Sequence, residues 1–186
     1  MNAPVDVSNI RIETDRLILR PWQAFDLNDL YTYAKVDGVG QLAGWKPHKS
    51  IEESRTILGF FLKDKKTLAI QLKETGHVIG SIGLEEFEPR AIHENNLLGR
   101  EIGYVLSKEY WGRGLMPEAV AAVIDYCFTT LDYDYVTCEH FVRNNQSRRV
   151  IEKLGFSFVD EVSVETRYET VEKTRYYIKY NPAKGR

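Results

Sequence analysis

The sequence predicts a mixed α/β fold in which helices pack on a single central sheet. Strand-like segments dominate the middle and the end of the chain, while helical patterns occur near the beginning and again between the later strands. This interleaving favours one sheet covered by helices. No internal repeat, low-complexity tract or linker interrupts the 186 residues. We therefore expect one domain over residues 1–186, with its core in about residues 10–180.

The first part of the chain combines one predicted strand with two predicted helices. Apolar residues alternate over residues 16–22, as expected for a strand. A helix follows from about Phe25, and a second helix is expected over Ile51–Leu62, because apolar residues recur there at helical spacing. Ser50 is a candidate N-cap of the second helix, and Glu53 would complete a capping box. The loop between these helices is rich in glycine.

The rest of the chain is predicted to be mostly strands. Strands are expected over residues 67–72, 78–84, 99–106, 135–142, 156–164 and 170–180. A long helix begins near Pro117, which fits a first helical turn because its missing N–H would have no partner there. Its apolar face continues to Leu131. A shorter helix ends at Gly155, with Asn144 as its candidate N-cap.

Composition excludes several classes of function. With 25 basic and 27 acidic side chains, the chain has no general attraction for nucleic acid. No apolar run approaches the ~20 residues that span a bilayer, and no signal-peptide pattern is present, so we expect a cytoplasmic protein without a membrane anchor. Four scattered histidines predict no metal site. The two cysteines, Cys127 and Cys138, are expected to pack as small apolar residues.

The most informative segment, residues 101–120, predicts a strand, a glycine loop and a helix. Gly112 and Gly114 allow a phosphate to approach the backbone, and free N–H groups at the start of the helix favour an anion. Arg113 adds a positive charge. A dinucleotide fingerprint would need a third glycine where Pro117 stands, and a P-loop would need a Gly-Lys-Ser/Thr sequence. A glycine pair before a helix also occurs in simple turns, so this pattern alone leaves both interpretations open.

A family resemblance extends this interpretation. Trp111-Gly-Arg-Gly-Leu-Met116 resembles the acyl-CoA pyrophosphate loop of the GCN5-related N-acetyltransferases (the GNAT family), with Gly114 at its most characteristic position. Trp111 stands where the broader pattern has Gln or Arg, and Met116 stands where it has a small residue. The strings Glu101-Ile-Gly-Tyr-Val-Leu, Tyr110-Trp-Gly-Arg-Gly and Pro117-Glu-Ala are similar to the RimJ/RimL-like branch, which acetylates protein N-termini.

Further segments extend the resemblance over nearly the whole chain, in the order that the family has them. They are Arg16-Leu-Ile-Leu-Arg-Pro, Gly44-Trp-Lys-Pro-His48, Asn144-Asn-Gln-Ser147 and Val150-Ile-Glu-Lys-Leu-Gly-Phe156. The resemblance implies the GNAT fold, an α/β (α+β) arrangement with a mixed, mostly antiparallel central sheet that is flanked by helices. In that fold the strands splay apart at the acetyl-CoA site.

The same resemblance implies an acyltransferase with acetyl-CoA as co-substrate and no metal. The residues that it assigns to cofactor binding are Tyr104, Val105, Leu106, Trp111, Gly112, Arg113, Gly114, Leu115, Met116, Asn144 and Ser147. Backbone N–H groups around Tyr104–Leu106 would polarise the thioester carbonyl, and such donors often supply the largest catalytic contribution.

Transfer to an amine adds requirements that side chains must meet. The amine must be neutral, and because α-amino groups have a pKa near ~8 and lysines near ~10.4, a base is needed near neutral pH. Glu101 is the candidate base, on the face of its strand opposite Tyr104; the alternative is a carboxylate paired with Arg100. The resemblance places Ser147 near the sulfur, as an orienting hydrogen-bond partner or an acid. It places Asn144 at the pantetheine or the substrate, although a helix cap alone would also explain this residue.

Two regions are candidates for the acceptor side. Trp45 would line an acceptor groove, or else anchor its own loop. Glu85 begins an acidic run with Glu86 and Glu88, which would attract a cationic acceptor or simply be solvated.

A basic cluster lies further along the chain. Arg143, Arg148 and Arg149 are expected either to contact the 3′-phosphate end of coenzyme A or to form a solvated helix face. The resemblance, together with these residues, implies an acetyl-CoA-dependent N-acetyltransferase that transfers acetyl directly to a primary amine, first of all a protein or peptide N-terminal α-amine of the ribosomal-protein-alanine type. A small-amine acetyltransferase (polyamine or aminoglycoside) and a non-catalytic acyl-CoA-binding module are the alternatives. Both a monomer and a homodimer are compatible with the sequence.

Overall fold

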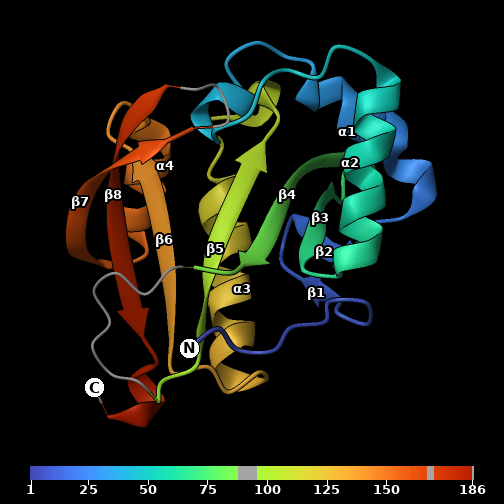
Figure 1. Cartoon of the computed structure of the whole chain (residues 1–186). Coiled ribbons are helices and arrows are strands. Elements are labelled where there is room, and N and C mark those ends of the chain that lie inside the picture. Colours follow the sequence, from blue (N-terminus) through green and yellow to red (C-terminus); the bar gives the residue numbers. More distant parts are fainter. Residues whose placement is uncertain (88–95, 167–169, 186) are drawn as a thin grey trace.

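The computed structural model describes residues 1–87, 96–166 and 170–185, which form one eight-stranded sheet with helices on both faces (Figure 1). The strands are β1 (Ile12–Glu13), β2 (Leu17–Pro21), β3 (Thr67–Leu72), β4 (Val78–Glu85), β5 (Gly99–Leu106), β6 (Tyr135–Phe141), β7 (Ser157–Glu165) and β8 (Val171–Tyr180). The helices are α1 (Leu27–Ala34), α2 (Ile51–Asp64), α3 (Leu115–Thr129) and α4 (Asn145–Lys153). The strand order is β1-β2-β3-β4-β5-β6-β8-β7, and only the β5–β6 pair is parallel.

The predicted mixed, mostly antiparallel sheet is therefore confirmed. One small difference is β1, which the sequence did not predict because a strand of two residues has no alternating pattern. None of the helices in the described ranges is long and apolar enough to cross a membrane.

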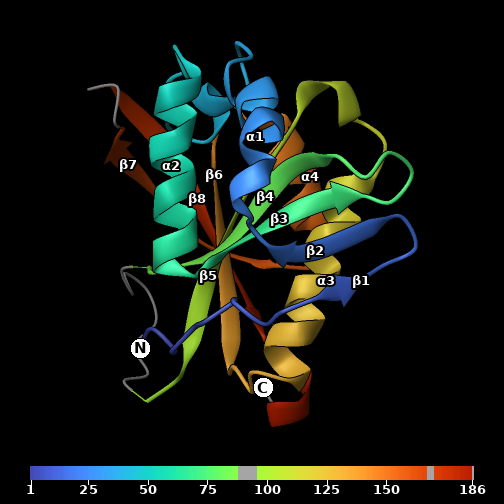
Figure 2. The same ribbon diagram turned by 90° about the vertical axis from the view of Figure 1, so that its right-hand side faces the viewer.

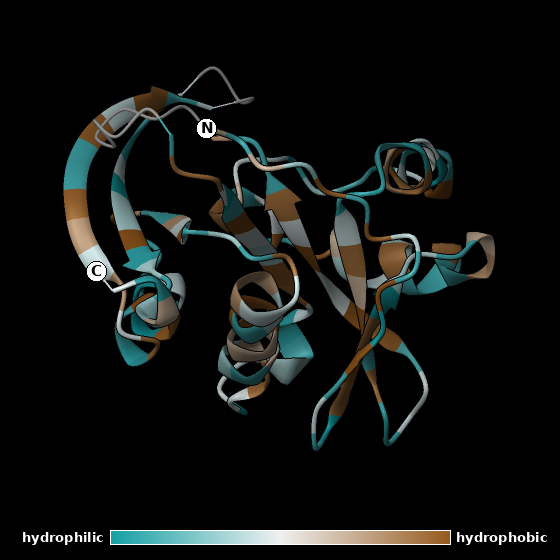
Figure 3. Cartoon of the chain, turned by 90° about the horizontal axis from the view of Figure 1, so that it is seen from below, coloured by the Kyte–Doolittle hydropathy of each residue, from teal (hydrophilic) through white to brown (hydrophobic). Residues whose placement is uncertain are grey.

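The helices divide into two layers. The pair α1 and α2 covers one face of the sheet over β2 to β5, while α3 and α4 cover the other face (Figures 1 and 2). Leu30 and Leu58 belong to the core under α1 and α2, whereas Ile102, Val123 and Ile151 belong to the core under α3 and α4. Apolar residues concentrate in the strands between the two layers (Figure 3). Each face of the sheet is thus buried by its own helix pair, as expected for a domain of this class.

Local capping follows the sequence closely. The Ser50 hydroxyl accepts a hydrogen bond from the backbone N–H of Glu53 at the start of α2. The Glu53 carboxylate binds the N–H of Lys49 (2.7 Å) and not that of Ser50, so the predicted capping box is shifted by one residue on this side. The Asn144 side chain caps α4 as predicted, by accepting from the backbone N–H of Ser147.

The strands β5 and β6 separate part of the way along their length. They pair only between Gly99–Glu101 and Tyr135–Thr137. Beyond that point β5 continues to Leu106 beside β4, and β6 continues to Phe141 beside β8. The expected splay of the sheet is therefore present, and it opens a gap between the second halves of two neighbouring strands.

Candidate active site

A pocket of about 380 Å³ occupies this gap. Its walls come from the second half of β5, the glycine loop (residues 110–114), the first turn of α3, one face of α4 along its whole length and the loop before α2. All the residues that the sequence assigned to cofactor binding line this pocket except Arg113. Segments more than 100 residues apart in the chain thus meet at one site, because Val39 and Ser147 line the same pocket.

The glycine loop has the backbone conformation that an anion site needs. Gly112 and Gly114 both have φ of 75°, a left-handed conformation that is strained for residues with a side chain. Gly114 is also the N-cap residue of α3, so the free N–H groups of the first helical turn lie directly after it. A helix N-terminus with exposed N–H groups binds phosphate or carboxylate. The Arg113 guanidinium lies over the Tyr110 ring (5.0 Å to its centre) and not in the pocket.

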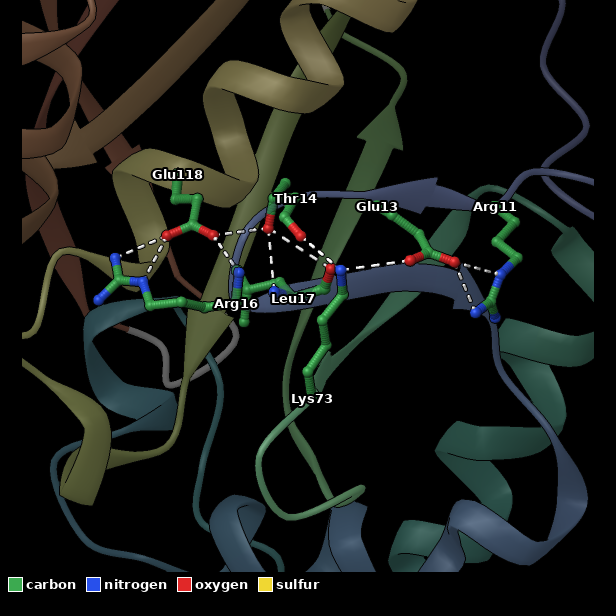
Figure 4. Close-up of polar contacts among 7 residues, drawn as sticks. All are labelled: Arg11, Glu13, Thr14, Arg16, Leu17, Lys73 and Glu118. Carbon is green, nitrogen blue, oxygen red and sulfur yellow. Dashed lines mark hydrogen bonds and ion pairs between the residues drawn. The ribbon is translucent and has the colours of Figure 1, made fainter.

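A polar network ties the first turn of α3 to the hairpin formed by β1 and β2 (Figure 4) and continues from there to the glycine loop. Glu118, on the first turn of α3, accepts hydrogen bonds from the Thr14 hydroxyl (2.6 Å) and from the backbone N–H and Nε of Arg16 (3.0 and 2.7 Å). Nη1 of Arg16 continues to the carbonyl oxygen of Arg113 (2.9 Å). Burial opposes ionisation of Glu118, but the hydrogen bonds from Thr14 and Arg16 outweigh it and hold the pKa of this carboxyl below its usual value. We call Arg16 and Glu118 the loop clamp.

The backbone of β5 presents donors to the gap. Ser107 donates its N–H to Ile79 on the β4 side (2.7 Å). Because N–H groups alternate in direction along an antiparallel pair, those of Tyr104 and Leu106 point away from β4 and into the gap. The carbonyl of Leu106 points the same way and accepts a hydrogen bond from the Trp111 indole (2.8 Å). This bond fixes the glycine loop against the end of β5.

Asn144 and Ser147 form the opposite wall of the pocket. The Asn144 carbonyl oxygen accepts from the N–H of Ser147 (3.1 Å), and its amide nitrogen donates to the carbonyl of Leu42 (3.2 Å). Both ends of this side chain are therefore bound by protein, so Asn144 holds α4 and the loop before α2 together at the pocket. The Ser147 hydroxyl lies 2.8 Å from the hydroxyl of Tyr104 across the gap.

Glu101 lies on the other face of β5. It pairs in register with Glu85 of β4, whereas its neighbours Ile102 and Tyr104 pack towards α3. Burial, reinforced by the negative charges of Glu139 and Glu85, raises the pKa of Glu101 to about 8. A carboxyl with this pKa exchanges its proton near neutral pH, as a general base must.

The alternative partner of Glu101 points elsewhere. Nε of Arg100 donates to the carbonyl of Ala3 (2.6 Å), and its Nη1 lies 3.7 Å from Glu86. Arg100 therefore does not pair with Glu101. Residues alternate between the two faces of a strand, which explains why adjacent residues of β5 have different partners.

The candidate acceptor residues occupy different environments. Trp45 does not line the pocket; its ring packs so closely on Gly40 that a Cβ there would lie 2.3 Å from it. Glu85 lies beside Glu101 in the sheet and forms an ion pair with Lys66 (2.5 Å). Glu86 is exposed, and Glu88 lies outside the described residues. Trp45 thus packs within its own loop, outside this pocket, while Glu85 belongs to the surroundings of Glu101.

The three arginines of the predicted basic cluster also lie in different environments. Arg143 binds Glu172 (2.9 Å), and Arg148 lies 3.7 Å from Glu152 on the same helix. Arg149 lines the pocket, and so does Lys153, one helical turn further along α4. The positive charge available to a ligand therefore comes from Arg149 and Lys153.

Three features of the site were not predicted from the sequence. Glu139 acts on the pKa of Glu101 from a neighbouring strand, and the loop clamp joins residues 102 positions apart. The hydroxyl of Tyr104 faces Ser147, although only the backbone of Tyr104 had been singled out. Each feature depends on strand order and register. Within the described residues, no cluster of His, Cys, Asp and Glu has an arrangement suited to a metal ion.

Comparisons with known proteins agree with this geometry. Residues 16–157 match the family model described as "Acetyltransferase (GNAT) domain". The Bacillus subtilis protein "Uncharacterized N-acetyltransferase YoaA" is 29% identical over 150 residues, which are 78% of this chain and 81% of the relative. The structure of an acetyltransferase (GNAT family) from Bacillus anthracis has a TM-score of 0.80 at 19% identity and covers 93% of this chain and 99% of that chain. Ribosomal-protein-S5-alanine acetyltransferase from Vibrio fischeri has a TM-score of 0.73 at 20% identity, over 93% and 97% of the two chains.

Proposed function

The chain belongs to the GNAT family and is an N-acetyltransferase, and from this premise we propose that it transfers acetyl from acetyl-CoA to the α-amine of a protein or peptide N-terminus. The observation that carries this proposal is the position of Glu101 on β5, in register with Glu85 of β4, where burial and the charges of Glu139 and Glu85 raise its pKa to about 8. An α-amino group has a pKa of ~7.7–8.0, whereas a lysine side chain has one of ~10.4. Proton transfer to Glu101 therefore costs less free energy from an α-ammonium than from a lysine side chain.

On the cofactor side, the pocket in the gap would take acetyl-CoA. The glycine loop and the first turn of α3 offer N–H groups to the pyrophosphate, because Gly112 and Gly114 keep the backbone open and left-handed. Arg149 and Lys153 would hold the remaining phosphate charge at the mouth of the pocket. The similarity of the fold to a ribosomal-protein-S5-alanine acetyltransferase supports an N-terminal acceptor.

The proposed reaction uses the Glu101 side chain on one face of β5 and backbone N–H groups of the same strand that point into the gap. Glu101 takes a proton from the acceptor amine, and the nitrogen lone pair attacks the thioester carbonyl carbon. As the C–N bond forms, the carbonyl electron pair moves to oxygen, where the N–H groups of Tyr104 and Leu106 stabilise the charge. The carbonyl then re-forms as the C–S bond breaks, and the sulfur leaves with its electron pair. The nitrogen, which still carries one proton more than an amide does, releases that second proton to solvent. Acetyl passes directly from sulfur to nitrogen while both substrates are bound.

We also propose that residues 1–186 act as one catalytic domain, and that the protein works in the cytoplasm as a monomer or a homodimer. Acetyl-CoA and newly made protein N-termini occur together in that compartment.

The test is release of free coenzyme A thiol from acetyl-CoA with a panel of amines. The panel contains peptides that begin with Ala, Ser or Thr, the same peptides with a formylated α-amine as matched controls, a polyamine and an aminoglycoside. We expect thiol release with the free peptides only. Thiol release with the polyamine or the aminoglycoside but not with the peptides would indicate a small-amine acetyltransferase instead. Binding of acetyl-CoA without release for any amine would instead indicate a non-catalytic acyl-CoA-binding module.

A further inference from the structure

Three polar side chains form a row across the sheet, on the face that carries Glu101. Glu85 of β4 pairs in register with Glu101 of β5, and Glu101 pairs in register with Thr137 of β6. Paired residues of neighbouring strands point to the same face, with their Cβ atoms about 5 Å apart. The next pair on this face of β4 and β5 is Gly83 with Gly103, so the row borders on backbone without side chains.

An ammonium group already occupies one end of this row. Nζ of Lys66 lies 2.5 Å from a carboxylate oxygen of Glu85, and about a third of each side chain is exposed (32% for Lys66 and 37% for Glu85). The main chain of Lys66 is held by the N–H of Leu84, which donates to its carbonyl (2.9 Å), so displacement of the ammonium needs only the side chain to move. Because a partly exposed ion pair contributes little to stability, exchange of one ammonium for another costs little free energy.

The other end of the row carries an unpaired hydroxyl. Thr137 is only 7% exposed, and its hydroxyl has no hydrogen-bond partner among the described residues. A buried polar group without a partner is costly to the folded protein. The hydroxyl oxygen can accept a hydrogen bond from the N–H of a ligand held beside Glu101. This row is therefore more than a group of acidic side chains, because one end binds an ammonium and the other end offers an unused acceptor.

We propose that Glu85 and Thr137, on either side of Glu101, bind the charged form of the acceptor amine, and that the Lys66 ammonium occupies Glu85 until the acceptor displaces it. This inference rests on the proposed function, because it names the residues that receive the acceptor of the same reaction. A primary ammonium has three N–H donors. Two of them bind Glu85 and Thr137, and the third gives its proton to the Glu101 carboxylate, which leaves the nitrogen lone pair free to attack.

The exchange also separates substrate from product by charge. Acetylation converts the ammonium into a neutral amide that has a single N–H. The amide has no charge to attract Glu85, so Lys66 returns to this carboxylate as the product leaves. An acceptor without a positive charge, such as a formylated N-terminus, cannot displace Lys66 in the first place.

The experiment measures peptide binding by calorimetry to protein loaded with coenzyme A, which has no acetyl group to transfer. The ligands are a peptide with a free N-terminal Ala and the same peptide with a formylated α-amine. Affinity is the primary measurement, because the charge of Glu85 also acts on the pKa of Glu101 and thereby on the rate. Wild type is compared with Glu85→Gln, Lys66→Met and the variant that carries both changes.

The two single variants should change affinity in opposite directions. Glu85→Gln should bind the free peptide about tenfold more weakly, because a hydrogen bond between charged groups is lost. Lys66→Met should bind it about threefold more tightly, because the competing ammonium is removed. The double variant should match Glu85→Gln, since Lys66 acts only through Glu85. The formylated peptide should show no difference among the four proteins.

Thr137→Val tests the other end of the row at nearly constant side-chain volume. The affinity for the free peptide should fall about threefold, whereas the free energy of unfolding should not fall, because an unpaired buried hydroxyl is removed. The matched control is the ion pair between Lys73 and Glu13 (3.2 Å), which is also partly exposed but belongs to the β1–β2 side of the sheet. Lys73→Met and Glu13→Gln should leave the affinity for both peptides unchanged.

Three results would overturn the exchange. They are an unchanged affinity for the free peptide in Glu85→Gln, a weaker affinity in Lys66→Met, and equal changes for the free and the formylated peptide. Failure of the proposed function is a different result, in which wild type acetylates a polyamine but no α-amine. The polyamine then replaces the peptide in the same comparison, with the same expected signs. A wild-type protein that acetylates no amine would overturn both proposals.

Discussion

The two faces of β5 prepare the same reaction by different means. On the face toward α3 and α4, backbone conformation defines the site: the left-handed Gly112 and Gly114, the helix start after them, and the N–H groups that point into the gap. On the opposite face, side-chain charge defines the site: Glu101 lies beside Glu85 in the sheet and within the field of Glu139.

The face made of backbone groups therefore serves acetyl-CoA binding, and the face made of carboxylates serves proton transfer. The backbone donors of such a site do not change with pH, because N–H groups do not titrate. A site made of three carboxylates depends on pH, because each charge changes the pKa of its neighbours. Changes on the first face should therefore act on acetyl-CoA affinity, and changes on the second face should act on turnover.

The largest effect is expected on the carboxylate face. Glu101→Gln should lower kcat by about 100-fold or more, since general bases contribute about 10²–10⁴ to rate, while acetyl-CoA affinity remains unchanged. Thiol release and calorimetric titration with acetyl-CoA measure the two quantities. The matched control is Glu86→Gln, which removes an exposed carboxylate of the same acidic run. Unchanged turnover in Glu101→Gln would remove this residue as the base.

The same variant tests the raised pKa through stability. Above its ordinary pKa of 4.5, wild type gains no stability from ionising Glu101, because the folded protein holds the proton up to a pH of about 8. The free energy of unfolding of wild type should therefore fall, relative to Glu101→Gln, as pH rises from about 4.5 through about 8. A constant difference between the two proteins over this range would contradict the raised pKa.

The next effect is expected at the glycine loop. Gly114→Ala forces a side chain into a left-handed conformation, which costs about 1–2 kcal/mol and displaces the N–H groups, so the Kd for acetyl-CoA should rise about tenfold. Gly76→Ala is a closely matched control, because Gly76 has φ of 76° and comparable space but lies in the turn after β3. Both variants should lose similar stability, and only Gly114→Ala should lose affinity. Equal affinities would place the pyrophosphate elsewhere.

A smaller effect is expected at the loop clamp. Arg16→Met keeps the aliphatic stem but removes the bonds to Glu118 and to the carbonyl of Arg113, so the KM for acetyl-CoA should rise about threefold to tenfold. Lys73→Met serves as the control, since the Lys73 ammonium binds Glu13 (3.2 Å) and the carbonyl of Thr14 (2.6 Å) in the same hairpin but makes no bond to Glu118 or Arg113 (Figure 4). Saturating acetyl-CoA should restore kcat in Arg16→Met. A fall in kcat at saturation would show that the clamp acts on more than the loop.

The smallest effect is a shift in pH dependence. Because the negative charge of Glu139 raises the pKa of Glu101, Glu139→Gln should lower that pKa and move the rising limb of kcat/KM to lower pH by about half a unit. The amine titrates identically in both proteins, so the difference between the two profiles reports Glu101. A limb that stays in place, or moves to higher pH, would contradict the electrostatic coupling.

Sequence reasoning succeeded where the chemistry is local. The caps at Ser50 and Asn144 and the left-handed Gly114 follow from a few neighbouring residues, so the elements around the pocket could be predicted. It failed where residues meet through strand order. Glu139 approaches Glu101 only because β6 lies beside β5 in parallel, and Arg16 reaches Glu118 only because a hairpin packs on α3. No local sequence pattern predicts either contact, since sheet register is a property of the whole fold.

The central claim concerns the acceptor, and a single peptide tests it directly. A peptide with a free N-terminal Ala and one internal lysine is incubated with acetyl-CoA and wild-type protein near pH 8, and mass spectrometry locates the acetyl group. Because Glu101 takes a proton more readily from an α-ammonium than from a lysine side chain, the protein should acetylate the α-amine in preference to the lysine. Acetylation of the lysine in preference to the α-amine would contradict the account.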